Sequence, residues 1–184
     1  MRYLASRAQL RASLLRWSLF TVPLVLGLGL LSGFAAGSGP ANAWFAALEK
    51  PAIYPPPAAF GIVWSVLYVL MGVALAMVIA AWGARLRGLA IVLFVLQLAL
   101  NLAWSPVFFA LHQPRLALGV IVAMIVAVLV TFVAFTRIRP LAGLLLLPYL
   151  AWICFAAVLN WQFVELNPDA EQVRGSGAAV RVEL

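Results

Sequence analysis

Long apolar runs separated by short polar joints dominate the pattern along this chain of 184 residues. A helix that crosses a bilayer needs about 20 apolar residues, within a range of roughly 17–25. Five runs meet this condition, at residues 17–36, 58–82, 89–111, 116–136 and 141–164. Strands that cross a membrane are about 10 residues long and alternate in polarity, whereas the run VIVAMIVAVLVTFVAF does not alternate. The pattern therefore predicts an all-α membrane protein, a bundle of five transmembrane helices.

One connection between the predicted spans is much longer than the others. Residues 37–57, with the sequence GSGPANAWFAALEKPAIYPPP, form a Pro-rich loop between the first and second spans. Proline lacks an N–H and fixes the backbone, so this segment cannot be one continuous helix. A loop of about 20 residues in a tightly jointed bundle is usually functional. We expect a single membrane domain over residues 17–168, with a basic extension at 1–16 and a polar tail at 169–184.

Charged residues are few and unevenly distributed. They make up 9% of the chain, against roughly 25% of an average soluble domain. The net charge is +7, but the arginines stand in short clusters beside apolar runs, as membrane anchors do, and this argues against a nucleic-acid partner. With five spans, the N-terminus and the joints at 85–87 and 137–139 share one side, which holds no acidic residue. The positive-inside rule places that side in the cytoplasm and loop 37–57 outside.

A second interpretation of the N-terminus remains open. The arginine-rich start, the following apolar stretch and the sequence ANA before Trp44 have the order of a cleavable secretory signal. Against this interpretation, the apolar stretch is long for a signal, and Gly29, Gly33 and Gly37 have the spacing of a helix-packing face. A mature protein that began at Trp44 would lack the first span.

Ionisable side chains are nearly absent from the predicted spans. No Asp, Glu, Lys or Arg lies well inside the first four, and Glu165 stands at the end of the fifth. This argues against catalysis by paired buried carboxylates, a proton relay and a voltage sensor. One His and one Cys cannot supply a multi-ligand metal site, and no phosphate-binding Gly-rich motif is present. We expect no metal and no required cofactor.

Uncharged polar and aromatic residues occupy three spans at overlapping depths. On each span they follow one helical face, formed by Trp64 and Tyr68, by Gln97, Asn101 and Trp104, and by Tyr149, Trp152, Ala156 and Asn160. An unpaired amide in hydrocarbon costs several kcal/mol, so the two asparagines are expected to face protein or a cavity. Aromatic walls with a few convergent polar groups are typical of a pocket for a large, mostly apolar ligand. Hydrogen bonds between helices of a solid bundle are the alternative.

Three blocks of sequence resemble one known family. They are WFAALEKPAIYPPPAAFGIVWSVLYVLMG, QLALNLAWSPVFF and PYLAWICFAAVLNWQFVELNP, and with their order the match covers about residues 20–168. The chain resembles the tryptophan-rich sensory protein and translocator protein family, TspO/MBR. The resemblance implies a five-helix membrane protein, commonly a homodimer, that binds porphyrins such as protoporphyrin IX or haem. In animal members it also implies binding of cholesterol and of synthetic drugs.

The resemblance also implies roles for individual residues. The polar and aromatic faces above would form the ligand pocket, and Trp44, Lys50, Pro55 and Pro56 would belong to a lid. Bacterial members are reported to degrade bound porphyrin in light, through residues that match Trp64 and Trp152.

The C-terminal block departs from the animal pattern. The cholesterol motif of animal members needs Tyr followed by a nearby Lys or Arg, whereas this chain has Trp161 and then Glu165. The sequence LNP at 166–168 resembles bacterial members, so we expect a bacterial membrane protein. The expected function is binding of porphyrins or similar flat apolar ligands, with sterols as a further candidate, in sensing, transport or regulation of tetrapyrrole metabolism. The alternatives are light-dependent porphyrin degradation and small-molecule transport.

Overall fold

The computed structural model describes residues 7–171, and its regular structure over that range is entirely helical. The long helices are α1 (Arg7–Ala35), α3 (Pro57–Ile79), α4 (Arg87–Ser105), α5 (Pro114–Ile138) and α7 (Leu147–Leu166). The short ones are α2 (Ala43–Ala47), α6 (Pro140–Leu144) and the π-helical turn η1 (Pro106–Ala110). Five segments are long and apolar enough to cross a membrane, with η1 extending the third and α6 beginning the fifth. The prediction of an all-α, five-helix membrane protein is confirmed, and the protein is a multi-pass integral membrane protein.

The limits of the helices differ from the predicted ones mainly at the N-terminus and at prolines. Helix α1 begins at Arg7, well before Trp17, so the described part of the basic extension continues the first span as a helix. Pro106 follows directly on α4 and has no N–H to donate to the preceding turn. The hydrogen bonding there widens to a π pattern, in which the N–H of Leu111 donates to the carbonyl of Pro106 at 2.8 Å.

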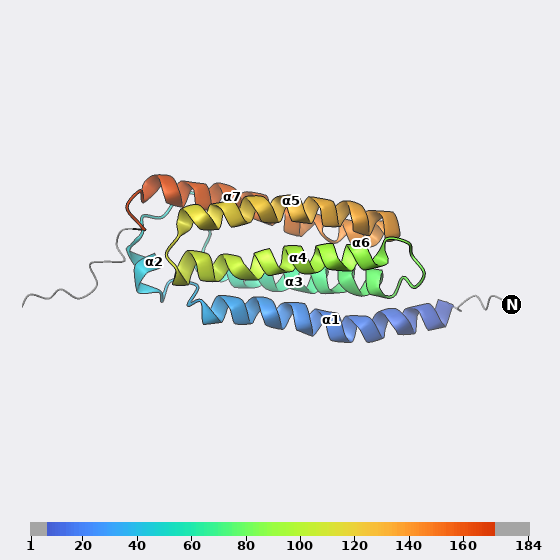
Figure 1. Ribbon diagram of the computed structural model, residues 1–184. Helices are drawn as coiled ribbons and strands as arrows, with labels where there is room; N and C mark the ends of the chain where they lie inside the picture. The colour runs from blue at the N-terminus through green and yellow to red at the C-terminus, as the bar shows by residue number, and fades with distance from the viewer. Residues whose placement is uncertain (1–6, 172–184) are drawn as a thin grey trace, which may run out of the picture.

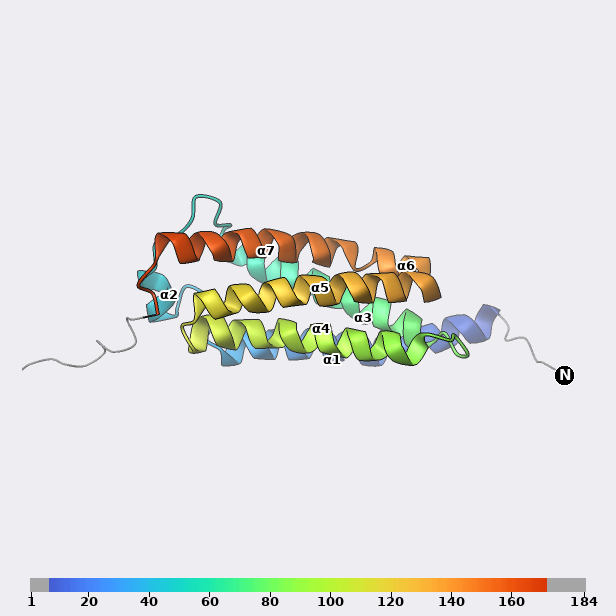
Figure 2. The same cartoon turned by 45° about the horizontal axis from the view of Figure 1, so that its top comes forward.

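The long helices form an antiparallel bundle (Figures 1 and 2). Helix α1 packs on α3, α4 packs on α5, α5 packs on α6 and α7, and α3 also contacts α4 and α7. The enclosed core includes the fully buried side chains of Met71, Phe94, Phe135 and Ile153. Large apolar side chains such as Leu19 are exposed on the outside, as expected of helices that satisfy their own backbone groups and contact lipid.

Helices α1 and α3 approach each other closely at two glycines. A Cβ atom on Gly72 would lie 2.6 Å from the Cα of Val22, and one on Gly29 would overlap the ring of Tyr68. The hydroxyl of Thr21 also donates to the carbonyl of Gly72 at 2.7 Å. The close contact and the hydrogen bond make α1 an integral part of the bundle, so a chain that began at Trp44 would lose both.

The two ends of the bundle differ in charge. The start of α1, the joint before α4 and the joint between α5 and α6 lie at one end, together with Arg11, Arg85 and Arg139 (Figure 1). The loop between α1 and α3, the joint between α4 and α5 and the end of α7 lie at the other end, which holds every acidic residue of the described range. We call this second end the lid end. Its position outside the cell stays a prediction.

Candidate functional site

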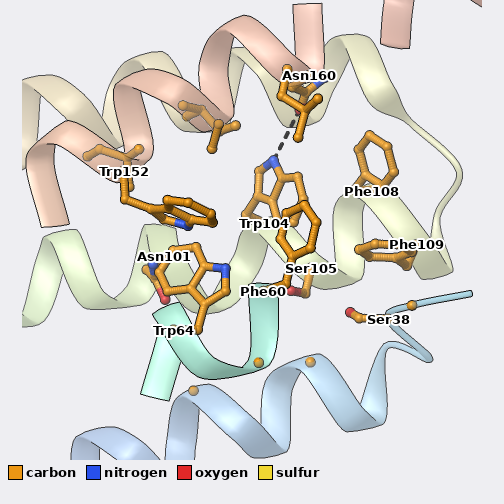
Figure 3. A pocket seen from close by; sticks show the side chains of 18 of the residues that line it. Ser38, Phe60, Trp64, Asn101, Trp104, Ser105, Phe108, Phe109, Trp152 and Asn160 are labelled. Atoms are coloured by element: carbon orange, nitrogen blue, oxygen red, sulfur yellow. Dashed lines mark hydrogen bonds between the residues drawn. The ribbon is translucent and has the colours of Figure 1, made fainter. Parts of the chain in front are cut away.

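A cavity of about 400 Å³ lies between α1, α3, α4 and α7 near the lid end (Figure 3). Eleven of its 27 lining residues are aromatic, and none of the described residues that line it is charged. Its volume lies within the roughly 300–1,000 Å³ that is typical of small-molecule sites. The bundle is therefore hollow at this depth, with the size and lining of a pocket for an apolar molecule.

Most of the predicted pocket residues line this cavity: Trp64, Tyr68, Asn101, Trp104, Trp152, Ala156 and Asn160. Gln97 and Tyr149 do not. Both lie further from the lid end, and Tyr149 is fully buried behind Trp64, with the ring centroids 6.2 Å apart. Gln97 is 1% exposed, and its side-chain nitrogen and oxygen have no hydrogen-bond partner among the described residues. These two share the helical face of the others but lie at the wrong depth to reach the cavity.

A hydrogen-bonded group of side chains from four helices lies at the inner end of the cavity, where Tyr68, Asn101 and Met124 line the wall and Tyr149 lies behind them. The hydroxyl of Tyr68 donates to Oδ1 of Asn101 at 2.9 Å, and Nδ2 of Asn101 donates to the hydroxyl of Tyr149 at 3.1 Å. The Tyr149 hydroxyl in turn lies 3.1 Å from Sδ of Met124. Because the amide of Asn101 is used by protein groups on both sides, it fixes the inner wall in one arrangement.

A second polar pair orients the wall formed by α4. The indole N–H of Trp104 donates to Oδ1 of Asn160 at 3.2 Å (Figure 3), and Nδ2 of Asn160 donates to the carbonyl of Pro114 at 2.9 Å. The Trp104 ring stacks on Phe108 with centroids 5.2 Å apart. In contrast, the indole nitrogen of Trp152 is buried without a hydrogen-bond partner among the described residues. Of the three indoles that line the cavity, that of Trp104 is fixed by a hydrogen bond and that of Trp152 has an unused donor among the described residues.

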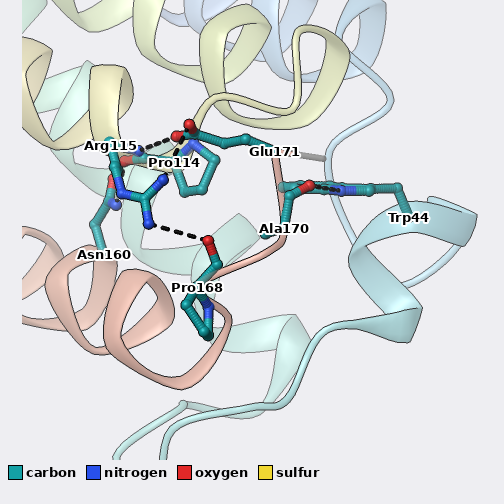
Figure 4. A network of polar contacts seen from close by, with 7 residues as sticks. All are labelled: Trp44, Pro114, Arg115, Asn160, Pro168, Ala170 and Glu171. Atoms are coloured by element: carbon teal, nitrogen blue, oxygen red, sulfur yellow. Dashed lines mark hydrogen bonds and ion pairs between the residues drawn. The ribbon is translucent and has the colours of Figure 1, made fainter. Parts of the chain in front are cut away.

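The loop between α1 and α3 covers the cavity through Phe45 rather than through Trp44. Phe45 is buried, lines the cavity and packs against Phe109 with ring centroids 5.1 Å apart. Trp44 does not line the cavity: it stacks on His112 with centroids 4.5 Å apart, and its indole N–H donates to the carbonyl of Ala170 at 3.1 Å (Figure 4). The predicted lid residue Trp44 therefore holds α2 in place from the outside.

The other predicted lid residues also lie outside the cavity. The ammonium group of Lys50 donates to the carbonyls of Phe45 and Leu48, and so closes the C-terminal end of α2. Burial lowers the pKa of Lys50 below its usual value. Pro55 and Pro56 do not line the cavity, whereas their chain neighbours Tyr54 and Pro57 do. Burial raises the pKa of the Tyr54 phenol.

Residues 167–171, which we call the C-terminal clasp, bind the lid to the bundle. The side chain of Asn167 accepts from the N–H of Glu49 at 2.8 Å and donates to its carbonyl at 3.0 Å. The guanidinium of Arg115 pairs with Glu171 at 3.2 Å and donates to the carbonyl of Pro168 at 3.0 Å (Figure 4). The start of the predicted polar tail thus packs against both the loop and the first turn of α5.

Several residues that line the cavity were not predicted from the sequence. They include Gly29, Leu30, Gly33 and Phe34 on α1, together with Phe60, Phe108, Phe109 and Phe163. Phe60 lies one turn before Trp64 and Phe163 lies one turn after Asn160. Extending the predicted faces by one turn toward the lid end would have found these two. No comparable pattern in the sequence indicated that residues of α1 would line the cavity.

Comparison with known proteins identifies the family. A sequence model of the TspO/MBR family matches residues 20–166, a range that includes every residue lining the cavity. The chain is 40% identical over 154 residues to the tryptophan-rich protein TspO of Chlorobaculum tepidum, which covers 82% of this chain and 98% of that one. It is 38% identical over 144 residues to the human translocator protein, with 77% and 84% covered. It is 36% identical over 131 residues to the tryptophan-rich sensory protein of Cereibacter sphaeroides, with 71% and 81% covered. This chain therefore belongs to the TspO/MBR family.

Proposed function

We propose that this membrane protein binds a porphyrin or a similarly flat, apolar molecule in the cavity, and so acts in sensing, transport or regulation of tetrapyrrole metabolism. The names of its relatives, a sensory protein and a translocator protein, agree with such a role. The observation that carries the proposal is the uncharged, aromatic-walled cavity of about 400 Å³ inside a membrane-spanning bundle.

The arrangement of the rings supports a flat ligand in particular. Trp64 stacks on Tyr68 with ring centroids 5.3 Å apart, and Figure 3 shows Trp64 and Trp152 on neighbouring walls of the same cavity. Aromatic rings prefer offset-stacked or edge-to-face contacts, each worth about 0.5–1.5 kcal/mol beyond the area buried. A planar macrocycle can make several such contacts at once. Its carboxylates would remain at the edge of the cavity, because an unpaired buried charge is costly.

Titration with protoporphyrin IX tests the proposal. In the wild-type protein, porphyrin is expected to quench tryptophan fluorescence and to show a shifted absorption band, from which the dissociation constant is read. Replacing Trp64 and Trp152 together by leucine removes two ring contacts, or about 1–3 kcal/mol, which corresponds to a roughly 5- to 150-fold weaker dissociation constant. The matched control replaces Trp82 and Trp161, which are exposed outside the cavity.

The two variants give opposite expectations. The control is expected to bind porphyrin as the wild type does. Equal dissociation constants for the wild type and for the cavity variant would show that porphyrin does not occupy this cavity.

Light-dependent degradation of the bound porphyrin is a second candidate. It is favoured by Trp64 and Trp152, two of the three tryptophans that line the cavity, of which Trp152 has an unused N–H among the described residues. The porphyrin absorption spectrum is followed under light and in the dark, with the wild type and with the double leucine variant. A product spectrum that needs both light and the two tryptophans supports the reaction. A spectrum that stays unchanged in light leaves binding alone.

A further inference from the structure

One side of the cavity reaches the surface of the bundle, whereas the opposite side is buried. On α1, the lining residues Leu30 and Phe34 are 48% and 86% exposed. On α3, the lining residues Pro57 and Gly61 are also exposed. The lining residues contributed by α4, η1 and α7 on the opposite side are mostly buried, among them Asn101, Phe108, Leu159, Asn160 and Phe163.

The packing of α3 shows that this opening faces α1. Gly61, Tyr68 and Gly72 follow one stripe of α3, at i, i+7 and i+11. At Gly72 and at Tyr68 this stripe packs tightly on α1, against Val22 and Gly29. At Gly61, on the same stripe, a Cβ atom would meet nothing within 4 Å. The two helices are therefore packed together over their inner part and separated near the lid end.

The course of the helices agrees with this. Figure 2 shows α3 running obliquely across the bundle, from beside α7 near the lid end to beside α1 at the other end. Gly61 lies about 6 Å below the start of α3, at ~1.5 Å per residue. Both sides of the opening belong to predicted membrane spans. The opening thus lies at the height of the hydrocarbon layer, in the leaflet next to the lid.

The end of the cavity that points along the bundle axis is covered instead. Phe45 of α2 is 3% exposed and packs on Phe108, Phe109 and Phe163. The clasp and Trp44 hold α2 in this position. Leaving along the axis requires these contacts to break, whereas the side toward the bilayer has no comparable cover among the described residues.

We propose that the cleft between residues 30–34 of α1 and residues 57–61 of α3 is a lateral portal, through which apolar molecules dissolved in the bilayer enter the cavity. This inference rests on the proposed ligand-binding function of the cavity. It adds that the ligand is a molecule that partitions into the hydrocarbon layer and reaches the site from lipid. Gly33 and Gly61 both line the cavity without a side chain, and so leave the portal unobstructed at these two positions.

The first test narrows the portal without changing the buried wall. Gly61→Leu places a side chain in open space, and leucine is a better helix former than glycine, so the fold is expected to persist. Gly27→Leu is the matched control, because Gly27 is on α1, is equally free of neighbours and does not line the cavity.

With protoporphyrin IX delivered from preloaded liposomes, Gly61→Leu is expected to slow association and dissociation alike. The expected slowing is about tenfold, within the one to three decades over which association rates vary among mutants of one site. Gly27→Leu is expected to keep wild-type rates. Wild-type rates in Gly61→Leu would overturn the portal.

The second test needs no porphyrin. Phosphatidylcholine brominated on its acyl chains quenches the tryptophans that it touches, and Trp64 lies one turn from Gly61 on the cavity side. Gly61→Leu is expected to reduce this quenching in the ligand-free protein, and the reduction is expected to vanish in a Trp64→Phe background. Reduced quenching together with absent porphyrin binding would support the portal and reject the proposed ligand. Quenching that Gly61→Leu leaves unchanged would reject the portal even if porphyrin binds.

Discussion

The amide of Asn101 is the central group of the inner wall, and its removal gives a prediction whose size follows from the hydrogen bonds. In Asn101→Leu the hydroxyl of Tyr68 loses its only acceptor among the described residues, while that of Tyr149 keeps the sulfur of Met124 at 3.1 Å. A buried polar group left unpaired costs about 1–3 kcal/mol, and single hydrogen bonds inside membrane proteins reach ~1.7 kcal/mol. We therefore expect the free energy of unfolding to fall by about 1–3 kcal/mol.

Equilibrium unfolding in mixed micelles, followed by circular dichroism, measures this loss. Adding Tyr68→Phe to Asn101→Leu is expected to recover part of it, because the orphaned hydroxyl is removed together with its partner. Ser65→Ala is the control, since Ser65 is only half-buried and its hydroxyl donates to the carbonyl of Gly61 within its own helix, away from the Asn101 network. A loss below about 0.5 kcal/mol in Asn101→Leu, or no recovery in the double variant, would contradict the assigned network, because each orphaned group costs more than this.

Three further predictions concern the helix contact, the clasp and the lid. Gly72→Leu overpacks the contact between α1 and α3 and is expected to cost about 1–3 kcal/mol in the same unfolding assay, whereas Gly27→Leu is not expected to destabilise. Asn167→Ala removes two hydrogen bonds to the backbone of Glu49 and is expected to speed amide hydrogen exchange in residues 43–50 about 5- to 30-fold, at ~1 kcal/mol per bond. The raised pKa of Tyr54 favours its neutral form in the folded state, so stability is lost as pH rises above about 10. A comparison of unfolding with Tyr54→Phe measures this difference.

The architecture and most of the inner wall could be predicted because lipid imposes strict rules on sequence. Asn101 and Asn160 lie inside spans where an amide needs a partner, and both are found buried and hydrogen-bonded. Depth was harder to predict. Gln97 and Tyr149 share a face with true lining residues, but the helices tilt and shift relative to one another. The sequence of a single span indicates which residues share a helical face, but it does not indicate how that helix tilts and shifts relative to the others.

The lid and the contribution of α1 show a different limit. Trp44 and Phe45 are neighbours on the short helix α2, and adjacent helical residues point about 100° apart. The residue that faces inward depends on the N-cap Asn42, whose Oδ1 accepts from the N–H of Phe45. Gly29 and Gly33 line the cavity by having no side chain, so a search for chemical groups passes over them.

Through the C-terminal clasp, residues beyond the last span hold the lid against the bundle. The match to the family model ends at residue 166, yet Asn167, which bonds Glu49, and Ala170, whose carbonyl accepts from Trp44, lie just after it. A protein truncated at residue 166 would keep all five membrane spans but would lose the hydrogen bonds that hold the lid over the cavity. Tags fused or cleaved close to residue 166 are therefore expected to change the rates at which a ligand enters and leaves the cavity, even where the helix bundle is intact.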